Sequence, residues 1–176
     1  MSDPLAVPSG WVRRFAHLVA PGGAVLDVAA GGGRHARFFR DRGHQVTAVD
    51  LVLDGLAGTQ GITLVQADLE AQPWPLPGQR FAAVIVTRYL HRPLLPHLAA
   101  ALEPEGGVLI YETFAEGQAE FGRPSNPDFL LRPNELLAAF APALTVIAYE
   151  HGIAYEPRPH AVQRLAAIAG RDLAPL

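Results

Sequence analysis

Short apolar segments alternate with segments of helical spacing along the chain, and this alternation limits the fold more than any other feature. Residues 81–87 (FAAVIVT) are apolar up to the final threonine, and residues 24–28 (AVLDV) are interrupted by one acid. A strand with one face in water would alternate apolar and polar residues, so continuous apolar residues indicate strands buried on both faces. Such strands, separated by helices, indicate a parallel sheet covered by helices. We therefore expect an α/β fold with a Rossmann-like, doubly wound, mostly parallel sheet.

Glycine and proline residues divide the chain into the individual elements of this fold. Three prolines within 71–79 indicate a loop, because proline interrupts both helices and strand ladders. The last two apolar segments are joined by a proline-rich turn at 155–160, and we expect them to form a C-terminal antiparallel hairpin. The expected strands are 24–28, 45–50, 62–68, 81–87, 108–114, 144–152 and 161–169, and the expected helices are 11–19, 33–43, 93–102 and 134–140.

The composition narrows the class of protein. The chain has 176 residues, 49% of them hydrophobic, and we expect residues 1–176 to form a single domain. It contains no cysteine, which excludes disulfides, thiolate zinc sites and cysteine nucleophiles. The histidines show no metal-binding spacing, so no metal site is expected. We see no signal peptide and no apolar run of the ~18 residues that a membrane helix needs, and we expect a cytoplasmic protein.

A glycine-rich turn joins the first expected strand to the next helix, within the segment 24–39 (AVLDVAAGGGRHARFF). In a parallel sheet, ligands bind outside the carboxyl ends of the strands, and this first turn is the usual place. The glycines lack Cβ atoms, so a ligand can approach their backbone closely. The spacing Gly31-x-Gly33-x-x-Ala36, with Asp50 downstream, fits the dinucleotide fingerprint loosely.

Asp27, placed just before this turn, distinguishes between two classes of cofactor. A carboxylate beside a pyrophosphate would repel it at short range, whereas a ligand that carries an ammonium would accept the charge. S-adenosylmethionine (SAM) carries an ammonium and a sulfonium and no phosphate, so Asp27 favours SAM over a dinucleotide. Its carboxylate could instead bind nearby loop amides, and the two roles are compatible.

The first strand and its turn resemble the first motif of the class I SAM-dependent methyltransferases, a strand of the form apolar-apolar-acid-apolar followed by a turn of small residues. Here the motif runs from Val25 through Asp27 to Gly33, with Ala29 where the family has its first glycine. The longer run DVAAGGGRHARFF resembles the tellurite-resistance and thiopurine-methyltransferase-like group of that family. The resemblance covers roughly residues 11–150 and implies the class I methyltransferase fold, with SAM as the cofactor.

The resemblance also implies which residues hold the cofactor. Asp50 would accept hydrogen bonds from the two ribose hydroxyls, since its two oxygens suit a vicinal diol. Asp68 would accept the adenine amino group, with the backbone N–H of Leu69 reading a ring nitrogen. Asp50 could instead cap a turn, and Asp68 could cap a loop. The implied cofactor-binding residues are Asp27, Ala29, Gly31, Gly33, Asp50, Leu51, Asp68, Leu69 and Thr87.

The acceptor pocket is expected in the loops after the fourth and fifth strands. Our candidate catalytic residues there are Tyr89, His91, Arg92 and Glu112. His91 could act as a base, or be an exposed residue at a helix start. Arg92 could clamp an anionic substrate, or be a surface arginine paired with an acid. The long loop 116–128 is typical of a lid or binding element, and the hairpin residues His151, Tyr155 and Arg158 could also reach the pocket.

We expect an enzyme that transfers a methyl group from SAM to a small polar or anionic molecule, acting as a monomer or homodimer. The sequence also allows an RNA methyltransferase or its partner subunit, since a basic face could form from Arg13, Arg14, Arg34, Arg37, Arg40 and Arg42. The net charge of −3 and the absence of lysine argue against nucleic acid as a partner. A non-catalytic SAM-binding module and an NAD-dependent oxidoreductase are two further functions that these motifs allow.

Overall fold

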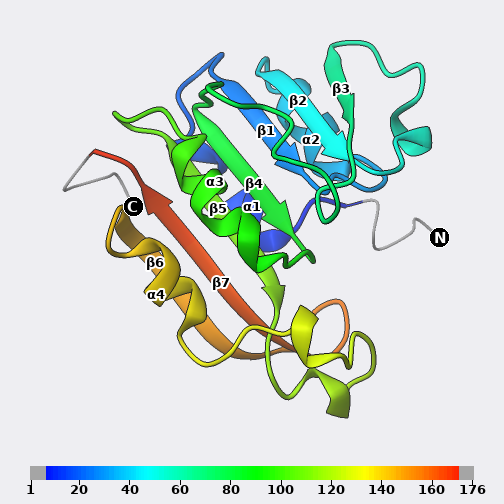
Figure 1. The fold of residues 1–176 in the computed structure, drawn as a ribbon, viewed down its shortest axis with the longest axis vertical. Helices are drawn as coiled ribbons and strands as arrows, with labels where there is room; N and C mark the ends of the chain where they lie inside the picture. The colour runs from blue at the N-terminus through cyan, green and yellow to red at the C-terminus, as the bar shows by residue number, and fades with distance from the viewer. Residues whose placement is uncertain (1–6, 171–176) are drawn as a thin grey trace.

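The computed structural model describes residues 7–170, which form a seven-stranded sheet in the order β3-β2-β1-β4-β5-β7-β6 (Figure 1). The five strands from β3 to β5 run parallel, and β7 is antiparallel to both β5 and β6. The expected mostly parallel sheet with a C-terminal antiparallel hairpin is therefore confirmed. The strands are β1 (Ala24–Val28), β2 (Gln45–Asp50), β3 (Ile62–Gln66), β4 (Ala83–Thr87), β5 (Val108–Phe114), β6 (Thr145–Ala154) and β7 (His160–Ile168).

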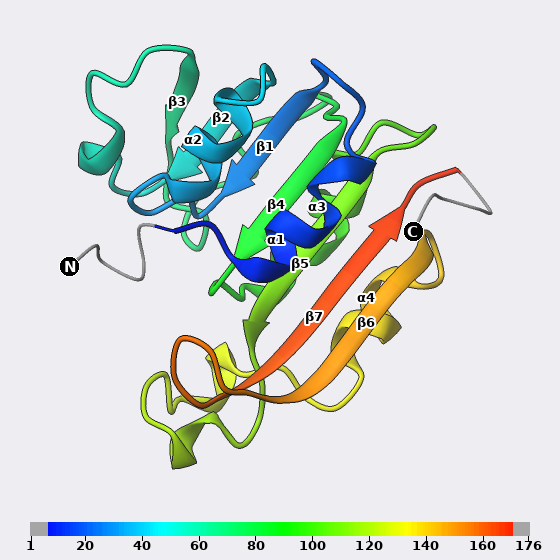
Figure 2. The ribbon, with the colours of Figure 1, turned by 180° about the vertical axis from the view of Figure 1, so that it is seen from behind.

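Helices cover both faces of this sheet. Figure 1 shows α3 (Leu95–Ala100) and α4 (Glu135–Phe140) in front of it, and Figure 2, the view from behind, shows α1 (Gly10–Phe15) and α2 (Arg34–Arg40) on the other face. Successive side chains of a strand point to opposite faces of the sheet. Because helices cover both faces, consecutive residues of a central strand must both be apolar. In β1, Val25 packs with the cluster under α1 and α2, while Leu26 packs with the cluster under α3 and α4.

The helices are shorter than expected, because several of their ends are 3₁₀ turns. The helix expected at 11–19 is α1 followed by η1 (Ala16–Leu18), and the one expected at 93–102 begins as η3 (Arg92–Leu94). Pro93 and Pro96 lie in the first turns of η3 and α3. The N–H groups of a first turn have no partner within the helix, so proline, which lacks an N–H, costs no hydrogen bond there. Further 3₁₀ turns are η2 (Asp54–Leu56), η4 (Gln118–Glu120) and η5 (Pro127–Phe129). In the described range 7–170, no helix is long and apolar enough to cross a membrane.

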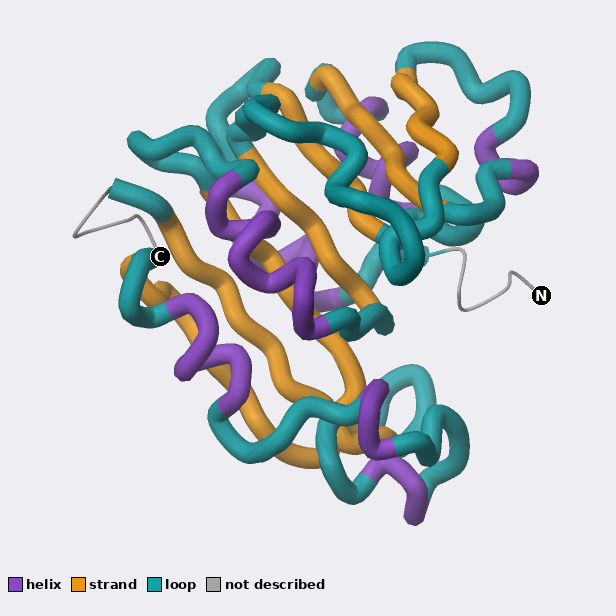
Figure 3. Tube along the Cα trace, in the orientation of Figure 1, coloured by secondary structure: helices purple, strands orange, loops and turns teal. Residues whose placement is uncertain are grey.

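The long connection after β5 projects beyond the carboxyl edge of the sheet and lies beside the β6–β7 turn (Figure 3). The side chain of Gln118 joins the two, because its Oε1 accepts a hydrogen bond from the Ala161 N–H at 2.9 Å. The loop expected at 116–128 therefore contains η4 and the first two residues of η5, and it is attached to the hairpin through Gln118.

Candidate functional site

The turn after β1 is held in a conformation that leaves one side of it open. Ala29, Gly31 and Gly33 have φ angles of 53°, 54° and 75°, all in the left-handed region. The Gly33 N–H donates to the Ala30 carbonyl at 2.8 Å and closes the turn. A Cβ atom on Gly31 would meet no atom within 4 Å. A ligand therefore has room to approach the backbone at Gly31.

The two outer glycines of the turn are expected to respond differently to alanine. A Cβ on Gly33 would lie 2.1 Å from Cδ2 of the buried Leu56, whereas a Cβ on Gly31 enters open space. We expect Gly33→Ala to lower the free energy of unfolding by about 3 kcal/mol, from overpacking and left-handed strain together. Gly31→Ala carries only the strain, about 1 kcal/mol. Urea denaturation of the two variants measures this difference, and equal losses would contradict the packing argument.

Asp50, at the carboxyl end of β2, is oriented by two backbone amides. Its Oδ2 accepts from the Gly31 N–H at 2.8 Å, and its Oδ1 accepts from the Val52 N–H at 3.0 Å. Each carboxylate oxygen retains a second lone pair. The side chain thus caps the turn and still offers two fixed acceptors to a pair of neighbouring hydroxyls.

Asp68, just beyond β3, also combines a capping role with free hydrogen-bonding capacity. Its Oδ1 accepts from the N–H groups of Glu70 and Ala71, both at 3.0 Å. Within residues 7–170, neither its Oδ2 nor the N–H of the next residue, Leu69, has a hydrogen-bond partner. One free acceptor and one free donor on consecutive residues match the amino group and ring nitrogen of an adenine edge.

A cleft of about 480 Å³ brings these residues together. Leu51, which is 56% exposed, and Tyr89 provide apolar surface there, and the Tyr89 hydroxyl is buried without a hydrogen-bond partner in the described chain. Its ionisable side chains, apart from Tyr89, are all carboxylates, so the cleft has no guanidinium or imidazole to receive a phosphate. Its lining residues are Ala29, Asp50, Leu51, Ala67, Asp68, Leu69, Glu70, Ala71 and Tyr89. We call it the nucleoside cleft, because it suits an uncharged or cationic nucleoside.

Asp27 does not line this cleft, and its carboxylate takes the second role expected from the sequence, the binding of a nearby backbone amide. The side chain is 1% exposed, and its Oδ2 accepts from the Ala36 N–H at 2.9 Å in the first turn of α2. The N-cap of α2 is Gly33, which has no side chain to cap the helix, so the strand supplies the missing acceptor. Burial raises the pKa of Asp27 to about 7, although the Ala36 amide and Arg34 oppose the shift. The carboxylates that face the cleft are Asp50, Asp68 and Glu70.

His35 is a buried polar residue whose role the sequence did not indicate. Its Nε2 accepts from the Ser9 N–H at 3.1 Å, which places the ring proton on Nδ1, 3.4 Å from Oγ1 of Thr87. Burial, with help from Arg34 and Arg88, lowers the pKa of His35 to about 3, so the ring is neutral at pH 7. His35 therefore links the segment before α1 (residues 7–9) to the end of β4. Its sequence signal is the helical spacing to Phe38 and Phe39, which places it on the buried face of α2.

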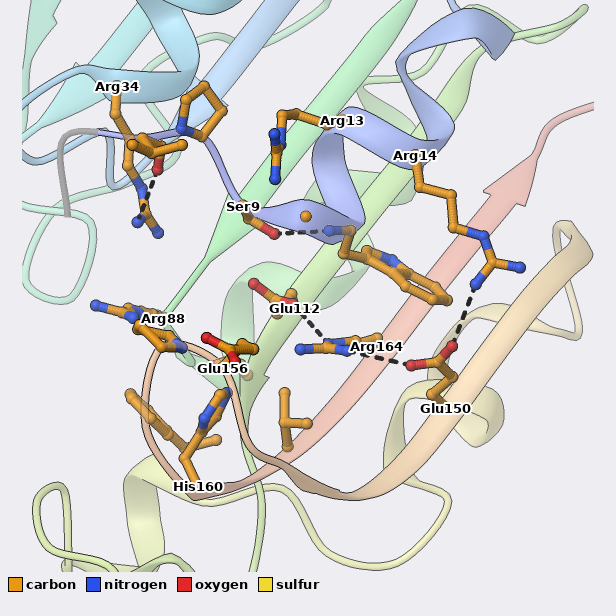
Figure 4. A pocket seen from close by; sticks show the side chains of 18 residues that line it. Ser9, Arg13, Arg14, Arg34, Arg88, Glu112, Glu150, Glu156, His160 and Arg164 are labelled. Atoms are coloured by element: carbon orange, nitrogen blue, oxygen red, sulfur yellow. Dashed lines mark hydrogen bonds and ion pairs between the residues drawn. The ribbon is translucent and has the colours of Figure 1, made fainter. Parts of the chain in front are cut away.

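A second pocket, of about 520 Å³, lies where α1 and the N-terminal segment meet the carboxyl ends of β4 and β5. A chain of ion pairs runs along one side of it (Figure 4): Arg164 contacts Glu112 at 2.6 Å and Glu150 at 3.2 Å, and Arg14 contacts Glu150 at 3.3 Å. Arg13, Arg34 and Arg88 lie on the other side. We call this hollow the arginine pocket.

The family model for the methyltransferase domain matches residues 25–106. This segment includes β1 from its second residue, the glycine turn, strands β2 to β4 and both aspartates of the nucleoside cleft. Over this segment the chain is similar to the class I SAM-dependent methyltransferases. No curated protein matches it closely enough to count as a relative.

Solved methyltransferase structures share the fold of this chain. TehB from Haemophilus influenzae superposes with a TM-score of 0.74 at 16% identity, over 92% of this chain, which spans 62% of the length of TehB. The 1,6-didemethyltoxoflavin-N1-methyltransferase from Burkholderia thailandensis, solved with bound 1,6-didemethyltoxoflavin and S-adenosylhomocysteine (SAH), has a TM-score of 0.67 at 21% identity, over 96% of this chain and 80% of that one. The glycopeptide N-methyltransferase MtfA in complex with SAM has a TM-score of 0.62 at 21% identity, over 91% and 86%.

The remaining candidate residues lie in different parts of the structure. Tyr89 lines the nucleoside cleft and Glu112 the arginine pocket. Two glycines of the turn and three residues at or after the end of β4 line neither, namely Gly31, Gly33, Thr87, His91 and Arg92. The turn of the hairpin reaches the arginine pocket with Glu156, Pro157 and His160, and not with the three residues expected. Arg164 is a further residue that the sequence analysis missed, and its signal is a charge within the apolar strand 161–169.

Arg92 is occupied by the protein itself, as an arginine paired with an acid. Its Nε and Nη2 contact the two carboxylate oxygens of Glu135 at 2.6 and 3.0 Å, and it also donates to the carbonyls of Asp128 and Leu130 at 2.8 and 2.9 Å. The hydrogen bond to Glu135 raises the pKa of Arg92. Four of its five N–H groups are used, so Arg92 anchors η5 and α4 and has no pair of N–H groups left to bind a substrate oxyanion.

Proposed function

We propose that this protein transfers a methyl group from SAM to a small polar or anionic molecule. The observation that carries the proposal is the lining of the nucleoside cleft, which combines fixed acceptors at Asp50, a free acceptor and donor at Asp68 and Leu69, and no basic group. This set fits a nucleoside without phosphates. A pyrophosphate would meet three carboxylates at short range, which argues against NAD.

The residues of this chain would mainly bind and align the reactants. When bound, SAM would supply an electrophilic methyl group on a sulfonium, whose bonding electron pair would stay with sulfur as a neutral thioether when an acceptor lone pair took the methyl. Because the leaving group is a neutral thioether, alignment is the main contribution that the protein makes. Asp50 would hold the ribose, and Asp68 with Leu69 the adenine. Thr87, fixed by His35, ends the strand between the two pockets.

The second pocket supports a small acceptor, because its volume of about 520 Å³ is in the range of small-molecule sites. Two of the structural neighbours are named for acting on a small molecule and on a glycopeptide. If the acceptor atom holds a proton, Glu112 is our candidate to receive it, with Arg164 orienting its carboxylate at 2.6 Å.

Calorimetry with SAM, SAH and NAD tests the cofactor. We expect micromolar binding of SAM and SAH and no binding of NAD. Tight NAD binding with no SAM signal would overturn the proposal. Methyl transfer is then measured with methyl-tritiated SAM and a panel of small acids, amines, phenols and RNA. A module that only binds SAM would label none of them, and labelling of RNA alone would favour the RNA methyltransferase.

A further inference from the structure

The arginine pocket carries more positive charge than its own carboxylates neutralise. Glu112 and Glu150 are both paired, since they form the chain of ion pairs with Arg164 and Arg14. Two guanidinium groups without an ion pair among residues 7–170 also line the pocket, those of Arg13 and Arg88, and Glu156 is the single carboxylate of its lining left to face them. This balance makes the pocket attractive to an anion.

Both of these arginines are available to a ligand. The side chains of Arg13 and Arg88 make no hydrogen bond or ion pair with any of residues 7–170, whereas Arg34 donates to the Val7 carbonyl at 3.4 Å. Arg13 enters from α1 and Arg88 from the end of β4, so two separate elements present guanidinium groups to one hollow (Figure 4). A guanidinium offers a planar fork of donors that matches the oxygens of a carboxylate or phosphate.

The backbone at Arg88 is specifically arranged to place it there. Its φ of 55° is in the left-handed region, which costs a residue other than glycine about 1–2 kcal/mol, and its N–H donates to the Glu112 carbonyl at 2.8 Å. Because of this turn, two consecutive residues line different hollows: Arg88 lines the arginine pocket, and Tyr89 lines the nucleoside cleft. The two hollows therefore meet at the end of β4, where a methyl donor and its acceptor must come together.

We infer that the arginine pocket binds an oxyanion of the methyl acceptor, a carboxylate or phosphate group, through Arg13 and Arg88. The inference rests on the proposed methyl transfer and names the class of acceptor, a small organic acid. The pocket also has an apolar wall, formed by Trp11, Phe114 and Val162, which would cover the carbon frame of such an acid.

The test uses wild-type protein saturated with SAH, whose binding is first verified by calorimetry. Ligand-observed NMR titrations then measure the dissociation constants of benzoate, its neutral counterpart benzamide, phenyl phosphate and inorganic phosphate. We expect an anion to bind at least about tenfold more tightly than benzamide, since a hydrogen bond to a charged group contributes about that factor. The comparison of benzoate with phenyl phosphate identifies which oxyanion the site prefers.

Three variants complete the experiment. Arg88→Gln and Arg13→Gln should each weaken anion binding about tenfold and leave benzamide unaffected. Arg158→Gln, in the exposed β6–β7 turn but outside the pocket lining, is the matched control and should bind as the wild type does. All three change exposed side chains, so their thermal midpoints should stay close to that of the wild type.

The possible failures can be told apart. If SAH binds but benzamide binds as tightly as the anions, or if the Arg13 and Arg88 variants retain wild-type affinity, the anion site is overturned and the proposed methyl transfer stands. If SAH does not bind to the wild type, the proposed function fails and the inference fails with it.

Discussion

Replacing Asp50 with alanine is expected to weaken SAM and SAH binding by about a hundredfold or more. In the proposed complex, each carboxylate oxygen accepts one ribose hydroxyl, and hydrogen bonds to charged groups contribute about 1.5–3 kcal/mol each. Two such bonds correspond to at least about two factors of ten in the dissociation constant. The substitution also removes the acceptor that holds the Gly31 N–H at 2.8 Å, so the glycine turn loses its orientation as well. Calorimetry on the wild type and the variant measures the change.

Asp54→Ala is the matched control for this prediction, because Asp54 is an exposed acid four residues further along that does not line the cleft. It should bind SAM with the wild-type affinity. Asp50→Asn keeps an acceptor for Gly31 without the negative charge, and we expect it to lie between the wild type and Asp50→Ala. An Asp50→Ala variant that is folded by circular dichroism and binds SAM as tightly as the wild type would remove Asp50 from the site.

The second large effect is a pair of opposite pH dependences of stability, from His35 and Asp27. The pKa of His35 is about 3 in the fold and near 6.5 when unfolded, so the unfolded chain takes up a proton first. The contribution of the neutral His35 to the free energy of unfolding is fully present above pH 6.5 and is lost as the pH falls toward 3. The pKa of Asp27 is about 7 in the fold and near 3.8 when unfolded, so between these pH values the folded protein binds the extra proton. The contribution of this proton to the free energy of unfolding is lost as the pH rises from 3.8 to 7. Each dependence approaches about 1.4 kcal/mol per pH unit, and the two oppose each other in the wild type.

Single substitutions should reveal the two dependences. Relative to the wild type, His35→Gln should become more stable as the pH falls from 6.5 to 4.5, by up to about 3 kcal/mol. Asp27→Asn should become more stable relative to the wild type as the pH rises from 4 to 7, by up to about 4 kcal/mol. Urea denaturation at four pH values between 4 and 7 measures both differences. Curves that run parallel to that of the wild type would show that neither group titrates differently in the fold.

The strands could be predicted well because their pattern is local. The bounds of β1, β2 and β5 agree with the expected segments, since an apolar run between glycine or polar residues has few competing structures. Asp50 and Asp68 could be placed in one site because parallel strands end at the same edge of a sheet. The helices were harder, because their ends depend on 3₁₀ turns and caps that the apolar spacing does not specify.

The roles of individual polar residues could not be predicted when their partners are distant in the sequence. Arg92 pairs with Glu135, 43 residues away, and nothing near Arg92 indicates that its guanidinium is occupied. Arg164 and Glu112 meet because β5 and β7 are antiparallel with those two residues in register. The direction of the Asp27 side chain depends on the missing side chain at Gly33, which only the helix geometry shows.

The partition between the two hollows has a consequence for how such a protein can change its substrate. Every residue that lines the nucleoside cleft lies between 29 and 89, whereas the arginine pocket takes much of its lining from residues 7–14 and from those after 111. Substitutions in α1 or in the β6–β7 turn can therefore reshape the proposed acceptor pocket without replacing a residue that lines the nucleoside cleft. We expect proteins with this architecture to exchange one acceptor for another by replacing their chain ends, while the middle of the chain stays as it is.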